Sequence, residues 1–162
     1  RSLRTTVSAT LRRMHTSPAP SLPRRLAAML YDALLVIAVV AVTHALALAF
    51  QVKVLDSDMH ALQPELAQVL LVASVYGFFI LFWMKQGQTL GMQAWRIRLV
   101  AFDGAPPSFG KALLRCVGAT LSAACLGLGY LWCLVDPHKR YWHDYLSRTE
   151  LMLLPKRVKD GP

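Results

Sequence analysis

Charged residues are nearly absent from two long stretches of this 162-residue chain. Residues 26–50 contain one charge, that of Asp32, and residues 66–84 contain none. A helix of about 20 mostly apolar residues is long enough to cross the hydrocarbon core of a bilayer. Both stretches are therefore predicted to span a membrane, because their length and composition argue against a soluble domain. The first is too long for a secretory signal, and no small-residue cleavage site follows it.

Signals for an enzyme, a metal centre or a nucleotide site are missing as well. The chain has three cysteines, an odd number, without CxxC spacing and in apolar surroundings, so we expect them to pack rather than to bind a metal. The glycines of GQTLG (residues 87–91) lack the Gly-Lys-Ser/Thr ending of a phosphate-binding loop. No Ser/His/Asp or Cys/His set shares a face. The sequence therefore predicts no enzymatic activity, no cofactor and no metal.

Acidic residues number 9 against 18 basic residues, which gives a net charge of +9. Six basic residues lie at or before Arg25 and eleven follow the second apolar stretch, so only Lys53 lies between the two stretches. This positive-inside pattern predicts that the N-terminus and the loop of residues 85–110 are cytoplasmic. We expect the basic residues to meet the anionic headgroups of the lipid bilayer, and we expect no nucleic-acid partner.

The length of the chain suits one domain. We expect a flexible basic segment over residues 1–20, a transmembrane domain over residues 21–154 and a basic tail over residues 155–162. Residues 1–13 are rich in Ser, Thr and Arg without an acid, which also suits an organellar transit peptide, with Met14 as an alternative start.

The predicted fold is an all-α membrane protein with two full spans and a third apolar region, residues 112–135. That region fits one span, a re-entrant pair of short helices broken at GLG (127–129), or a surface helix followed by a short helix. The charge rule favours a cytoplasmic C-terminus and hence the forms that do not cross. Within the preceding loop, WRIRLVAF (95–102) alternates enough for a short strand or an interfacial stretch.

Small residues in the third region have spacings that favour helix contacts. Such residues let a neighbouring helix approach closely. We expect this stretch to be the surface for another membrane subunit or a second copy of the chain, through Gly118, Ser122, Gly127 and Gly129.

Four elements together resemble the RDD family of small prokaryotic membrane proteins. They are RLAAMLYD (25–32), GQTLGMQAWRIRLVAFDG (87–104), Arg115 and WHDYLSRT (142–149). The resemblance places the three signature residues of the family on Arg25, Asp32 and Asp144. It places the loop motif on Gly87, Thr89 and Gly91, and the loop arginine on Arg98.

The resemblance implies a helical protein of the bacterial inner membrane, and the composition of residues 1–13 leaves an organellar inner membrane as the alternative. Most family members have no assigned function, and transport, including cation/proton antiport, has been proposed for some. The chain departs from the family pattern at Met92, where a basic residue is usual, and at Trp95, where a small one is.

Asp32 is the charged residue on which the functional interpretation depends. A carboxylate inside a span costs about 3 kcal/mol on insertion scales, so it needs a partner or a task. Arg25 is seven residues away, about 10 Å along a helix, which is too far for an ion pair and leaves Arg25 at the headgroups. Our first choice of partner is Arg115, with Arg98 and His143 as further members of a possible ion-pair or ion site.

Two functions follow from these residues. The chain is either an accessory or assembly subunit packed against a larger membrane complex, or a homo-oligomeric transporter in which Asp32 carries a cation or proton. A transporter needs polar groups across the whole bilayer. The outer halves of the spans offer only a few polar residues, namely Thr43, His44, Gln68 and Ser74. This shortage favours the accessory function.

Overall fold

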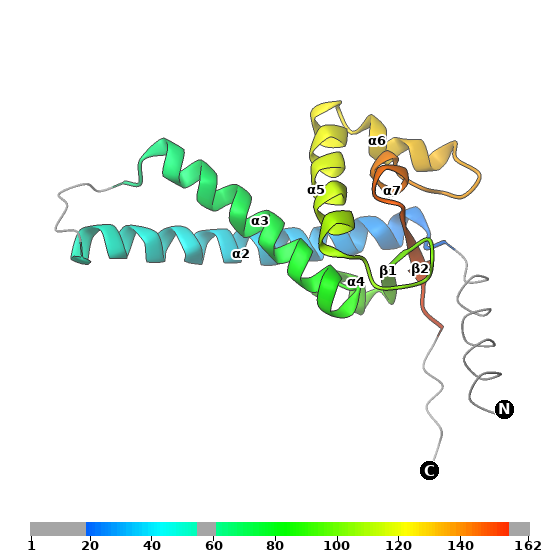
Figure 1. Cartoon of the computed structure of the whole chain (residues 1–162), viewed down its shortest axis with the longest axis horizontal. Coiled ribbons are helices and arrows are strands. Elements are labelled where there is room, and N and C mark those ends of the chain that lie inside the picture. The colour runs from blue at the N-terminus through cyan, green and yellow to red at the C-terminus, as the bar shows by residue number, and fades with distance from the viewer. Residues whose placement is uncertain (1–18, 55–60, 156–162) are drawn as a thin grey trace, which may run out of the picture.

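The computed structural model describes residues 19–54 and 61–155, and 69% of these residues are helical. Two long helices, α2 (Leu22–Val54) and α3 (Pro64–Gln86), run side by side over part of their length, and the shorter elements gather at one end of this pair (Figure 1). The shorter elements are α4 (Leu90–Ala94), β1 (Ile97–Ala101), α5 (Phe109–Ala124), α6 (Leu128–Leu131), the 3-10 turn η1 (Trp132–Leu134), α7 (Trp142–Ser147) and β2 (Thr149–Leu153). The predicted N-terminal segment and C-terminal tail lie almost wholly outside the described residues.

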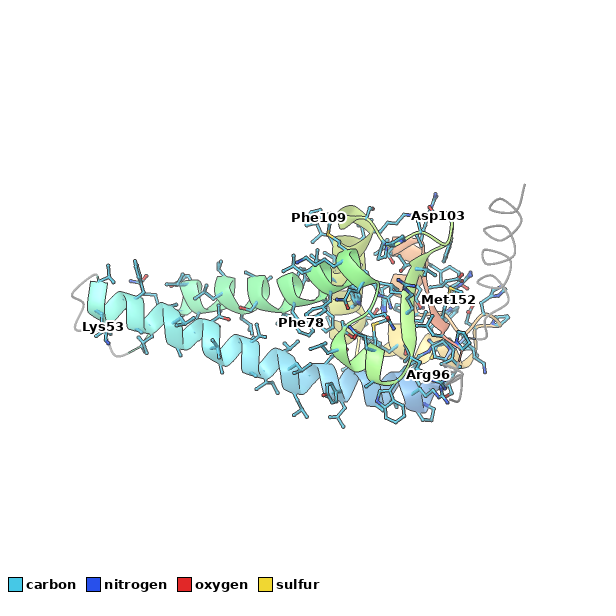
Figure 2. All side chains as sticks on the ribbon, turned by 90° about the horizontal axis from the view of Figure 1, so that it is seen from below. Lys53, Phe78, Arg96, Asp103, Phe109 and Met152 are labelled. Atoms are coloured by element: carbon cyan, nitrogen blue, oxygen red, sulfur yellow. The ribbon has the colours of Figure 1, made fainter. Side chains whose placement is uncertain are left out.

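The helices α2 and α3 are both long and apolar enough to cross a membrane, which confirms the two predicted spans. Most of their apolar side chains point outward, as Figure 2 shows along the two helices. Three of the four polar residues named for the outer halves contact one another or the backbone, and the fourth, Gln68, is exposed. Ser74 donates a hydrogen bond of 3.1 Å to Thr43, and the two ring nitrogens of His44 lie 2.9 and 3.1 Å from the carbonyl oxygens of Val40 and Ala67.

The motif GQTLG ends one helix and starts the next. Gly87 closes α3 in the left-handed conformation (φ +66°), and its N–H donates to Trp83 O. A Cβ atom at Gly87 would lie 2.8 Å from Leu99 O, so glycine is required there for space as well as for conformation. Thr89 is the N-cap of α4 and accepts the N–H of Met92 at 3.2 Å.

The loop between α3 and α5 and the segment after α7 form a two-stranded antiparallel sheet. β1 pairs with β2 from Ile97↔Leu153 to Ala101↔Thr149. The strand β1 confirms the strand option for residues 95–102. The strand β2 was not predicted, because a five-residue strand has little signal of its own and its partner lies some 50 positions earlier.

The third apolar region is broken rather than continuous. The helix α5 and the pair α6–η1 are bent by 107° at residues 125–127, where Gly127 has a φ of +77°. Because β2 pairs with β1, the chain after this bent pair returns to the end of the molecule from which it left. The structure therefore contradicts one continuous helix and agrees with both alternatives that consist of two helices.

The small residues of this region pack inside the chain. A Cβ atom at Gly118 would lie 2.8 Å from His143 Cβ, and one at Gly129 would lie 2.1 Å from Ser122 Oγ. The prediction that they form an intermolecular surface was wrong for Gly118, Ser122 and Gly129, because they bring α5 against α6 and α7. Gly127 has open space around it and serves the turn.

Candidate functional site

The carboxylate of Asp32 lies against the start of α4. Its Oδ1 accepts the N–H of Gly91 at 2.8 Å, and its Oδ2 accepts the hydroxyl hydrogen of Thr89. The side chain is buried, and a Cβ atom at Gly91 would lie 2.4 Å from Ala28 O and 2.8 Å from Asp32 Oδ1. The signature aspartate and the loop motif thus form one contact that fixes the loop to α2.

Arg115 was the wrong partner for Asp32. Its guanidinium forms an ion pair with Asp144 and donates a further hydrogen bond of 3.0 Å to Thr149 Oγ1. The other oxygen of Asp144 accepts the N–H of Tyr141 at 2.8 Å, at the first turn of α7. Arg115 and Asp144 are both buried, so this pair ties α5, α7 and β2 together in the interior.

Arg25 is buried rather than projecting to the headgroups. It is 4% exposed, its Nε donates to Pro20 O at 2.9 Å, and its guanidinium lies 4.9 Å from the centroid of the Tyr141 ring. Within residues 19–54 and 61–155 it forms no ion pair, and its Nη1 has no hydrogen-bond partner. Because an arginine does not lose its proton in a protein, this is a buried positive charge without a carboxylate partner.

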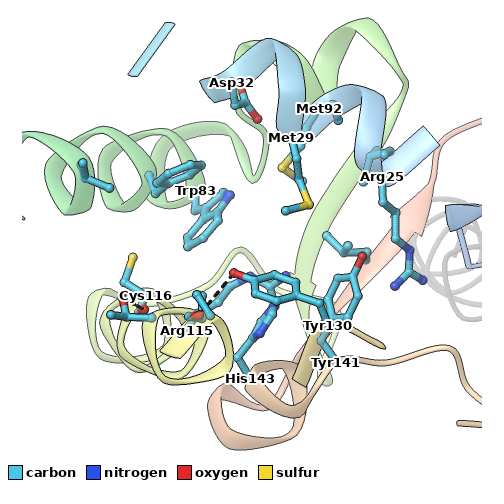
Figure 3. A pocket seen from close by; sticks show the side chains of 18 of the residues that line it. Arg25, Met29, Asp32, Trp83, Met92, Arg115, Cys116, Tyr130, Tyr141 and His143 are labelled. Atoms are coloured by element: carbon cyan, nitrogen blue, oxygen red, sulfur yellow. Dashed lines mark hydrogen bonds between the residues drawn. The ribbon is translucent and has the colours of Figure 1, made fainter. Parts of the chain in front are cut away.

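A cavity of about 350 Å³ lies between α2, α3, α5, α6 and α7 (Figure 3). Arg25, Arg115 and His143 line its polar end. Val75, Phe79, Ala119 and Ala123 line its apolar end, at the level of the α3 span.

Unpaired nitrogen atoms gather around this cavity. Four buried side-chain nitrogens of the described residues have no hydrogen-bond partner. Three of these belong to residues that line the cavity, namely Arg25 Nη1, Trp83 Nε1 and His143 Nδ1. Most buried polar atoms in proteins are hydrogen-bonded, so these three nitrogens are available to an acceptor that enters the cavity.

His143 is a neutral member of this group. Its ring lies 5.1 Å from the Tyr130 ring and 5.0 Å from the Tyr141 ring between their centroids. Burial, followed by the charges of Arg115 and Arg25, lowers the pKa of His143 from its ordinary 6.5 to about 2. The imidazole is therefore uncharged at physiological pH, and it is unsuited to bind and release protons there.

One predicted site residue, Arg98, lies away from the cavity, and aromatic residues that were not predicted line it. Arg98 lies on β1 beside Gly87, does not line the cavity, and forms no ion pair with any described residue. Trp83, Tyr130 and Tyr141 also line the cavity, and the sequence pattern placed none of them in a site. Their positions depend on how α3, α6 and α7 pack against one another, which the sequence pattern does not specify.

Comparison with known proteins identifies a family. The model of the RDD family matches residues 19–148, a range that includes the three predicted signature residues and the whole cavity except Leu151. No curated protein and no solved structure gave a significant match.

Proposed function

This chain belongs to the RDD family of small membrane proteins, and we propose that it is a non-enzymatic accessory or assembly subunit that docks on another membrane protein. The observation that carries the proposal is a row of exposed small residues on α2. We call it the alanine row: Ala38, Ala41, Ala45 and Ala49.

The alanine row has the geometry of a helix-docking face. At 3.6 residues per turn its members fall within an arc of about 80°. Thr43 and His44, which contact α3, lie about 160° and 100° around α2 from the centre of the row. Small residues along one face let a second helix approach closely and gain van der Waals contact, which is the main source of helix association in lipid. The row extends over about three turns of the span and is not covered by any described part of the chain.

The polar groups of the spans support the same function over transport. A transporter needs polar groups that are free to handle an ion along a route across the bilayer. Thr43, His44 and Ser74 contact one another or the backbone between α2 and α3. Asp32 is engaged by Thr89 and Gly91 at the start of α4. The alternative, cation/proton exchange through Asp32, has no comparable support.

The proposal includes an orientation. The end of the molecule that carries α4, the sheet and α7 faces the cytoplasm of a bacterial inner membrane, because the basic residues flank that end of the spans. Asp103, in the exposed turn after β1, offers a test. In an Asp103→Cys variant a membrane-impermeant maleimide labels the new cysteine in inverted vesicles but not in intact cells. Wild-type protein, with its three native cysteines, is the control.

Purification of the full chain from its native membrane in mild detergent tests the docking. The wild type co-purifies with another membrane protein at fixed stoichiometry, and Ala45→Leu, which adds bulk in the centre of the row, reduces that recovery at least fivefold. Leu46→Phe is the matched control, because it adds bulk one position along and about 100° around the helix. Equal recovery of the partner with both variants would overturn the proposal.

A further inference from the structure

We propose that the cavity binds one anionic phospholipid of the surrounding leaflet, with its phosphate at Arg25 and an acyl chain along the apolar end. This binding site is independent of the alanine row, which lies on another face of α2.

The polar end of the cavity has donors for which residues 19–54 and 61–155 provide no acceptor. Arg25 and Trp83 each have a buried N–H without a partner, and His143 adds a ring nitrogen in the same condition. All three residues are more than nine-tenths buried and line the cavity. Figure 3 shows the Trp83 indole, the two tyrosine rings and His143 arranged around the same space. Phosphate oxygens accept several hydrogen bonds at once, which suits such a group of donors.

The distribution of charge favours an anion at Arg25. Arg115 also lines the cavity, but Asp144 balances its charge. Asp32 lines the cavity too, yet its two oxygens are engaged by Thr89 and Gly91. Arg25 is the remaining cation of the lining, and it contacts the carbonyl of Pro20 and the ring and hydroxyl of Tyr141, none of which carries a negative charge. A buried charge without a counter-charge is costly, and a phosphate would supply that counter-charge.

The other end of the cavity fits an acyl chain. Its lining there is apolar, and Thr120 and Ala123 at this end are exposed, so that the cavity opens between α3 and α5. The hydrogen bond between Tyr76 and Thr120 places this opening beside the membrane-spanning part of α3. A volume of about 350 Å³ holds a headgroup and the first part of a chain, and the rest of the lipid remains in the bilayer.

Three probes distinguish the contribution of the phosphate to binding from that of the acyl chains. The full chain is purified in mild detergent, stripped of lipid, and mixed with dioleoylphosphatidylglycerol, with dioleoylglycerol, or with inorganic phosphate. Native mass spectrometry then counts the bound molecules. We expect one phosphatidylglycerol per chain and at least tenfold weaker binding of dioleoylglycerol, which has the same chains without the phosphate. Equal binding of the two lipids, or binding of inorganic phosphate as strong as that of the lipid, would overturn the proposal.

Variants locate the site. Arg25→Gln lowers the affinity for phosphatidylglycerol at least tenfold, whereas Arg24→Gln, on the adjacent residue that does not line the cavity, changes it less than twofold. Equal effects of the two substitutions would contradict the proposal. If Arg25→Gln does not fold, Ala123→Phe is the second test, because it adds bulk at the exposed opening of the cavity and leaves the buried groups in place. We expect it to weaken lipid binding. Undiminished lipid binding by Ala123→Phe would place the lipid elsewhere.

Discussion

Asp32 Oδ1 accepts the backbone N–H of Gly91 at 2.8 Å, across 59 positions of the sequence. This contact joins the only charge in the apolar centre of α2 to the first turn of α4. An intramembrane carboxylate is often taken as an ion site. Here both of its oxygens accept hydrogen bonds that hold the loop against the helix.

Loss of the Asp32 carboxylate destabilises the fold. Asp32→Ala leaves the Gly91 N–H and the Thr89 hydroxyl buried without an acceptor, and each unpaired group costs about 1–3 kcal/mol. We expect the free energy of unfolding in detergent, measured by denaturant titration, to fall by about 2–4 kcal/mol. Asp32→Asn, which keeps one acceptor oxygen, loses less than Asp32→Ala. A variant Asp32→Ala as stable as the wild type would show that the contact contributes nothing.

The tight approach at Gly91 gives a second prediction. In Gly91→Ala the new Cβ meets Ala28 O at 2.4 Å, a backbone atom that has no room to move. We expect a loss of about 2–3 kcal/mol in the same unfolding measurement. Gly77→Ala is the matched control, because its Cβ meets no atom within 4 Å and alanine favours a helix interior. Equal stability of the two variants would mean that the loop does not lie against α2 in this way.

The buried pair of Arg115 and Asp144 predicts strong coupling. Replacing either residue alone leaves the other charge buried without a partner, which costs about 3–5 kcal/mol. We expect the double variant Arg115→Met/Asp144→Leu to lose about 1–3 kcal/mol less than the sum of the two single variants. The exposed pair of Lys111 and Asp103, at 3.5 Å, is the control, with a coupling of at most about 1 kcal/mol. A thermodynamic cycle with no coupling at Arg115 would refute the ion pair.

The low pKa of His143 predicts a pH dependence. In the unfolded chain a histidine takes up a proton below about pH 6.5. In the folded chain His143 stays neutral until about pH 2. The unfolded state therefore binds one more proton over this window, and stability falls by about 1.4 kcal/mol for each pH unit below 6.5.

The measurement for this effect compares variants over pH 7 to 4. His143→Gln removes the contribution of His143 to the loss of stability in acid. His138→Gln, which changes an exposed residue of the turn after η1, leaves the dependence of stability on pH unchanged. If the slope of stability against pH is the same in His143→Gln as in the wild type, the histidine is charged or exposed in the folded protein.

The sequence predicted the two spans and the break in the third apolar region, because both depend on residues close together in the chain. Apolar length gave the spans, and the glycines at 127 and 129 gave the break in the third region. The partner of Asp32 was beyond this reasoning, because the groups that bind it are a threonine hydroxyl and a backbone N–H, neither of which stands out as a charge.

The same limit applies to the rest of the site. Charge alone suggested Arg115 for Asp32, whereas the pairing of β2 with β1 and the fold of α7 bring Asp144 and Thr149 to that arginine. The unpaired nitrogens of Trp83 and His143 have no signature in the sequence at all.

The mass of the particle purified from the native membrane in mild detergent tests the central claim most directly. The accessory function predicts a particle that contains this 18.0 kDa chain together with at least one other membrane protein at a fixed ratio. A particle composed of this chain alone, as a monomer or a homo-oligomer, would contradict the claim. Cation flux in proteoliposomes that is lost in Asp32→Asn would then establish transport in its place.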